Sequence, residues 1–85
     1  MKVGFYCTKD DFLGYQTPFC AMNDEDAMRH FEMMINNEGT IFDIHRENFN
    51  LYRLGDFDSE SGIVDNNNYF ILAGTSVRRR KKDVE

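Results

Sequence analysis

The residues with the clearest chemical potential form one basic run, residues 78–82, near the end of this 85-residue sequence. The run holds half of the 10 lysine and arginine residues in the chain. Guanidinium and ammonium groups in such a cluster bind phosphate oxygens, which predicts contact with nucleic acid or another polyanion. The alternative is a solvated terminus that only promotes solubility. The predicted DNA-binding residues are Arg78, Arg79, Arg80, Lys81 and Lys82.

The rest of the chain carries charge of the opposite sign. The formal net charge is −5, but residues 1–77 hold 5 basic and 13 acidic side chains, which gives −8, and residues 78–85 carry +3. An acidic body repels a polyanion, and five phosphate contacts to a single strand supply a salt slope of only about −3.5. The sequence therefore predicts weak, salt-dependent binding to single-stranded DNA by a monomer, and stronger binding by a dimer with two basic tails.

Residues that bind metals or act as nucleophiles are scattered along the chain. Cys7, Cys20, His30 and His45 have suitable side chains, but their spacing matches no known ligand pattern. The 6 glycines form no phosphate-binding loop, and no nucleophile stands in a recognisable pairing with a base. We therefore predict a protein that is not an enzyme and that has no metal and no cofactor.

The N-terminal residues and the two cysteines indicate which cellular compartment to expect. The apolar stretch at residues 3–7 is too short for a signal peptide, and no segment approaches the roughly 18 apolar residues of a membrane span. We therefore expect a cytosolic protein without a membrane contact, in which Cys7 and Cys20 are reduced and buried. A disulfide between the two is the alternative.

Length and hydrophobic patterning predict one domain over residues 1–77, followed by a basic, mobile tail over residues 78–85. Pro18 lies in the second predicted strand and cannot donate a backbone hydrogen bond, so that strand is expected at a sheet edge. Residues 69–73 are apolar on both faces, which predicts the centre of a sheet or a strand covered on both sides. The predicted strands are residues 3–8, 15–21, 51–57 and 63–73, the last with a bulge or loop at residues 66–68.

One amphipathic helix is predicted between the two pairs of strands. Asn23 is a preferred N-cap residue, and Gly39 is expected to follow the last turn as its C-terminal cap. A short helical turn is expected after Asp43. The order strand, strand, helix, short helix, strand, strand predicts a small antiparallel α+β domain with the main helix packed on one sheet face. The apolar stripe of that helix consists of Ala27, Phe31, Met34 and Ile35.

Met33 is the odd position on this helix because it falls among the polar residues. One interpretation is a singly exposed apolar side chain, which needs no explanation. The other is a contact to a partner or to a second copy, and on that interpretation Met33 is the predicted partner-binding residue. The small size of the chain and its exposed sheet edge also predict a homo-oligomer.

The segment from His45 to Gly62 resembles a known family, the nonstructural protein of the gokushoviruses, small single-stranded-DNA phages of the microvirus group. That family has a His-Pro-Glu-Asp-Tyr motif, an apolar strand with Leu-Gly, then Phe-Asp and a Thr-Gly turn. A Pro-Phe pair before the helix and an Ala-x-Arg-x-Phe pattern within it recur too, so the resemblance covers about residues 3–64. Arg46 replaces the family's proline and Ser61 its threonine. The matching residues are Pro18, Phe19, Ala27, Arg29, Phe31, Leu54, Gly55, Phe57, Asp58 and Gly62.

The resemblance implies an early phage protein, absent from the capsid, that acts in the host cytoplasm. Its family is similar in role to the microvirus protein that switches replication from duplex DNA to the packaging of single-stranded genomes. The resemblance carries over no catalytic or binding residues, and the basic run is not part of its pattern. The sequence therefore predicts a non-enzymatic factor in viral DNA replication and genome packaging that binds DNA or the replication complex. The alternative is a protein–protein adaptor for the phage initiator, the procapsid or a host factor.

Overall fold

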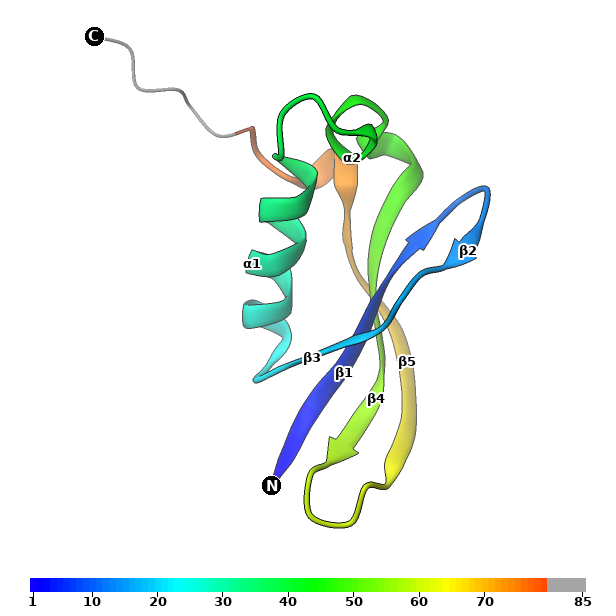
Figure 1. Cartoon of the computed structure of the whole chain (residues 1–85), viewed down its shortest axis with the longest axis vertical. Helices are drawn as coiled ribbons and strands as arrows, with labels where there is room; N and C mark the ends of the chain where they lie inside the picture. Colours follow the sequence, from blue (N-terminus) through cyan, green and yellow to red (C-terminus); the bar gives the residue numbers. More distant parts are fainter. Residues whose placement is uncertain (80–85) are drawn as a thin grey trace, which may run out of the picture.

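The computed structural model describes residues 1–79 as a five-stranded antiparallel sheet with one main helix on one face (Figure 1). The strand order is β2-β1-β4-β5, and β3 also pairs with β1. The predicted antiparallel α+β domain is therefore confirmed. The elements are β1 Lys2–Asp10, β2 Gly14–Tyr15, β3 Phe19–Ala21, α1 Asp24–Ile35, α2 Ile41–Ile44, the 3-10 turn η1 Arg46–Asn48, β4 Phe49–Asp58, β5 Val64–Ala73 and the 3-10 turn η2 Gly74–Ser76.

The first strand is paired along both edges, so β1 and β4 form the middle of the sheet. The chain reverses at Gly14, whose φ of +91° lies in the left-handed region that glycine tolerates without strain. The predicted strand at residues 15–21 is split into β2 and β3, and Pro18 lies between them. Because β2 and β3 pair only with β1, the predicted edge position is confirmed.

The prediction that residues 69–73 lie at the centre of the sheet is wrong. β5 is the other edge strand, and residues 64–70 are exposed. The two-sided apolar pattern has another cause: Ile71 and Leu72 pack against the core, while Phe70 packs against Tyr52. The register of β5 against β4 shifts between Arg53 and Gly55, which confirms the bulge expected at the asparagines.

Helix α1 begins as predicted and ends slightly earlier. The Asn23 side chain accepts a hydrogen bond from the backbone N–H of Asp26 at 2.9 Å, which confirms the N-cap. The C-cap residue is Asn36, so Gly39, with a φ of +84°, lies in the loop to α2 and does not cap the helix. The buried side chains of α1 pack against β1, β3 and β4. The core consists of Tyr6, Ala21, Ala27, Phe31, Ile35, Phe49, Leu51 and Val77.

A buried guanidinium closes the end of the domain where α1, α2 and the last described residues meet. Arg46 donates to the Val77 carbonyl at 3.0 Å, to Asp43 Oδ1 at 2.7 Å, to Asn36 Oδ1 at 3.0 Å and to the Ile35 carbonyl at 3.4 Å. We call this group the Arg46 clasp. Its partners come from segments that are distant in sequence, so the clasp fixes the C-terminal segment against the helix.

Gly74 allows the C-terminal segment to approach the clasp. A Cβ atom on Gly74 would lie 2.1 Å from the carbonyl oxygen of Arg46 and 2.8 Å from that of Phe49. Both are backbone atoms that cannot move aside cheaply, so only glycine fits at this position without a shift of η1 or η2.

Candidate nucleic-acid interface

The sheet face opposite α1 carries a line of aromatic side chains. Tyr6 lies in the core under α1, so the alternation of a strand directs its neighbour Cys7 to the opposite face, as it does Lys9. Tyr52 is the register partner of Cys7, Tyr15 is the partner of Lys9, and Phe70 is the partner of Tyr52. These residues therefore share the face that α1 does not cover.

The three rings are in direct contact, and we call Tyr15, Tyr52 and Phe70 the aromatic row. Tyr15 and Tyr52 pack edge to face with centroids 5.6 Å apart, and Tyr52 and Phe70 do the same at 5.7 Å. Tyr15 is 50% exposed and Phe70 is 52% exposed, so the two ends of the row are open to solvent. The middle ring, Tyr52, is half-buried, so the row presents two exposed rings joined by a third, an arrangement of the kind on which single-stranded bases stack in other proteins.

One positive charge lies within this row. The Lys9 ammonium is 5.3 Å from the ring centre of Tyr15 and 5.8 Å from that of Tyr52. It forms no ion pair with a carboxylate of residues 1–79, so its charge is not neutralised by the acidic body. Aromatic rings for the bases and a cation for the phosphates are the two chemical requirements of a single-strand binding surface.

The opposite side of β4 is fixed by a polar network around Arg53, the residue after Tyr52. Arg53 Nη1 is 2.6 Å from Asp24 Oδ1, and Nη2 pairs with Asp56. The Tyr6 hydroxyl donates to Asp24 at 2.7 Å and the Tyr69 hydroxyl donates to it at 2.6 Å. This Arg53 network joins the first residue of α1 to β4 and β5, and thereby holds the strands that carry Tyr52 and Phe70.

The Arg53 network also shifts the pKa values of two of its residues, Asp24 and Tyr6. Desolvation would raise the pKa of Asp24, but the hydrogen bonds from Tyr69, Tyr6 and Arg53 outweigh it and hold that pKa below its usual range. Burial, together with the hydrogen bond to Asp24, raises the pKa of Tyr6 above its usual range, so its phenol remains a donor well into the alkaline range.

Asp24→Asn should reduce the acid sensitivity of the fold. A carboxyl whose folded pKa is depressed stabilises the protein above its unfolded pKa of about 3.9, and that contribution is lost as the pH falls through the folded value. We expect the variant to be less stable than the parent at pH 7 and to lose less stability when the pH falls below about 4. Urea unfolding at several pH values measures this, with the exposed Glu25→Gln as control. An equal loss in parent and variant would contradict the assignment.

The first two residues of the predicted basic tail, Arg78 and Arg79, form polar contacts with residues of the folded domain. The Arg78 carbonyl accepts a hydrogen bond from Asn36 Nδ2 at 2.9 Å, and Arg79 Nη1 lies 3.0 Å from Asp43 Oδ1. Both arginine side chains are exposed. Arg80, Lys81 and Lys82 lie outside the described residues, so the structure does not place the rest of the predicted DNA-binding run.

Met33 and Arg78 are brought together at the end of α1. Met33 is 70% exposed, and the two residues line one open cavity of about 650 Å³. None of the aromatic row lines this cavity, so the structure separates the row from the two predicted site residues. The full lining is Arg29, Glu32, Met33, Asn36, Asn37, Glu38 and Arg78.

The cysteine prediction is correct for one residue and wrong for the other. Cys7 is buried but Cys20 is exposed, because its register partner Phe5 lies on the face away from α1. Neither forms a disulfide. Within residues 1–79, no three potential ligand side chains gather into a metal-binding group, and no helix is long and apolar enough to cross a membrane.

The chain matches the family model described as phage ORF5 protein over residues 3–77. The chain belongs to this family. The phage origin implied by the sequence resemblance is thereby confirmed. No curated protein and no solved structure matches this phage ORF5 protein.

The aromatic row is the part of the site that sequence reasoning missed in this ORF5 protein. The strands that carry Tyr15, Tyr52 and Phe70 are visible in the sequence as runs of β-forming residues. The alignment of the three rings on one face is not visible in the sequence, because the register of β1 against β4 pairs segments more than 35 residues apart. A one-residue slip would place each ring on the other face.

Proposed function

We propose that this phage ORF5 protein is a non-enzymatic accessory protein that binds single-stranded DNA during viral genome replication and packaging in the host cytoplasm. Its relationship to the gokushovirus nonstructural proteins is part of this proposal. The observation that supports it most is the aromatic row with Lys9 over two of its rings, Tyr15 and Tyr52. The basic run from Arg78 onward supplies the phosphate contacts that an otherwise acidic surface lacks.

The expected affinity follows from two contributions. Each base stacked on an aromatic side chain contributes about 1–3 kcal/mol, and this term depends little on salt. The basic run contributes a salt-dependent term of about −0.7 in slope per phosphate. The charge of −8 on residues 1–77 repels the DNA phosphates and so lowers the affinity, most strongly at low ionic strength. Binding should therefore persist at moderate salt through the row and strengthen at low salt through the run.

Replacing the five basic residues 78–82 with glutamine tests the phosphate contacts. This variant keeps the backbone bonds that Asn36 and Arg46 make to Arg78 and Val77, which a truncated chain would disturb. We expect the salt slope for single-stranded DNA to become shallower by about 3.5. Fluorescence anisotropy over a range of salt concentrations measures it, with Lys2→Gln as a control for loss of one positive charge.

Two outcomes of this experiment separate the parts of the proposal. Equal slopes for the parent and the glutamine variant would show that the basic run does not contact phosphates. Failure of the parent protein to bind single-stranded DNA at low salt would remove the DNA-binding function altogether.

The cavity beside Met33 supports a second candidate function, a protein–protein adaptor for the phage initiator, the procapsid or a host factor. An exposed methionine in an open cavity with charged residues on its rim has the composition of a transient protein interface. Co-purification from infected cells after nuclease digestion distinguishes the two functions, because only a protein-mediated partner survives. Loss of that partner in Met33→Lys, with the fold intact, would favour the adaptor.

A further inference from the structure

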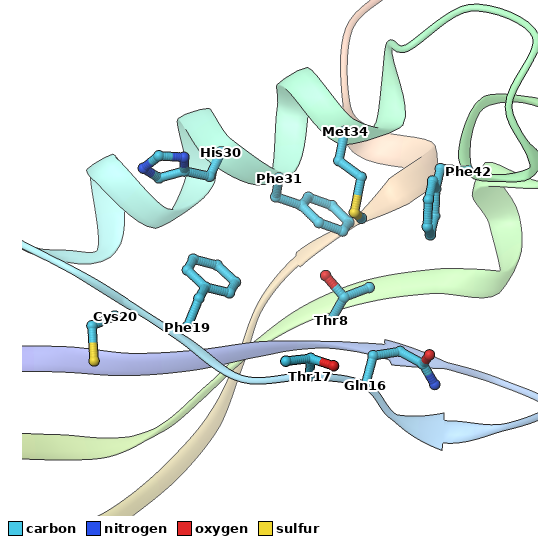
Figure 2. A pocket seen from close by; sticks show the side chains of 9 residues that line it. All are labelled: Thr8, Gln16, Thr17, Phe19, Cys20, His30, Phe31, Met34 and Phe42. Carbon is cyan, nitrogen blue, oxygen red and sulfur yellow. The ribbon is translucent and has the colours of Figure 1, made fainter.

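A second cavity, of about 470 Å³, lies between α1 and the sheet on the face opposite the aromatic row (Figure 2). Its walls come from β1, the segment between β2 and β3, α1 and α2. It is separate from the cavity beside Met33 and shares no residue with it. The lining residues are Thr8, Gln16, Thr17, Phe19, Cys20, His30, Phe31, Met34 and Phe42.

Three phenylalanine rings and one methionine form the apolar part of the cavity wall. Figure 2 shows Phe31 and Met34 extending from α1 toward the sheet, with Phe19 opposite them and Phe42 at one end. Two of these rings pack edge to face with a neighbour: Phe19 with His30, which also lines the cavity, at 6.0 Å, and Phe42 with Phe49, outside the cavity, at 5.0 Å. Rings held in this way provide fixed apolar surfaces for a flat guest.

One hydroxyl that lines the cavity has no hydrogen-bond partner in the described part of the chain. Thr8 is only 8% exposed, it lines the cavity, and its side chain forms no hydrogen bond with any other residue of the described part of the chain. Figure 2 shows its side chain pointing from the sheet into the space below Phe31. Thr8 Oγ1 is not among the buried side-chain polar atoms that lack a partner, so the hydroxyl is accessible from the cavity and free to form a hydrogen bond with a ligand there.

We infer that this cavity binds a single unpaired nucleobase of the DNA strand that lies on the aromatic row, an inference that rests on the proposed function. A nucleobase is a flat ring with hydrogen-bonding groups on its edge, which matches aromatic walls and the free Thr8 hydroxyl. The position of the cavity supports the same ligand. Tyr15 ends the row, and the next residues, Gln16 and Thr17, form the wall of the cavity. A strand that leaves the row at Tyr15 and continues along this edge of the sheet therefore meets two residues of the cavity wall.

Methionine methyl NMR with an oligothymidylate of about eight nucleotides tests the inference, since single-strand binding modules cover about 4–16 nucleotides. The Met34 methyl group should shift on addition of the oligonucleotide, and that of Met33, on the other side of α1, should not. Thr8→Val should reduce the Met34 shift and weaken binding several-fold without lowering the melting temperature, because valine keeps the shape and β-propensity of threonine. The exposed Thr75→Val is the matched control.

Each other outcome overturns the inference. Binding of the oligonucleotide without a Met34 shift would exclude the cavity and leave the DNA-binding function standing. A Met34 shift with N-acetyl-tyrosinamide but not with the oligonucleotide would assign the cavity to a protein side chain. A parent protein that does not bind the oligonucleotide at low salt would remove the proposed function and this inference together.

Discussion

Replacing Arg46 with methionine is expected to lower the free energy of unfolding by about 2–4 kcal/mol, from the loss of its hydrogen bonds to the Val77 and Ile35 carbonyls and to Asn36. Asp43 would also lose its closest cationic partner, at 2.7 Å. A domain of this size has a total stability of roughly 5–10 kcal/mol, so the variant should unfold at a markedly lower temperature.

Urea denaturation followed by circular dichroism measures this effect. The control is Arg29→Met, which removes an exposed arginine from α1. The double variant Asp43→Leu with Arg46→Met removes both charges and should recover part of the loss, because in the single variant the buried Asp43 carboxylate keeps only the exposed Arg79 as a cationic partner. A single variant as stable as the parent would show that the Arg46 clasp contributes little.

Replacing Tyr52 with leucine is expected to weaken single-stranded DNA binding by about tenfold. Tyr52 contacts both other rings of the aromatic row, and loss of one stacking partner costs about 1–3 kcal/mol. The dependence of affinity on salt should not change, because no phosphate contact is removed. Anisotropy at two salt concentrations measures both quantities.

Phe12→Leu is the matched control for Tyr52→Leu. Phe12 is 80% exposed in the loop between β1 and β2 and takes no part in the aromatic row. The Phe12→Leu variant should bind single-stranded DNA with the affinity of the parent protein. Unchanged affinity of a folded Tyr52→Leu protein would contradict the role of the row, and a change in salt slope would indicate a phosphate contact instead.

The elements of the fold were predictable because each depends on residues close together in sequence. Asn23 identifies the start of α1 through its own side chain, and Pro18 excludes a central strand through its missing N–H. Residues 69–73 were misplaced for a physical reason. The hydrophobicity of these side chains indicates which faces of the strand are covered. Whether the strand lies at the edge or the centre of the sheet depends instead on its backbone hydrogen bonds to neighbouring strands, and side-chain types do not encode those bonds.

The site was less predictable than the fold. The basic run was visible from composition, but the attachment of Arg79 to Asp43 depends on where α2 meets the C-terminal segment. The sequence offered no sign that Arg46 is buried, since an arginine beside His45 and Glu47 has the appearance of a surface residue. Its four hydrogen-bond acceptors come from three separate segments, which meet only in the folded chain.

The pairing of β1 with β4 has a consequence for the order in which the protein folds. Lys2 lies opposite Asp58 and Asp10 opposite Phe49, so this pairing closes a loop of roughly 40–55 residues. The β4–β5 hairpin closes through a short turn and forms on a microsecond timescale, whereas the β1–β4 pairing has to wait for the larger loop. We therefore expect the β4–β5 hairpin to form first, with Tyr52 and Phe70 in contact before the β1–β4 pairing adds Tyr15 to the aromatic row.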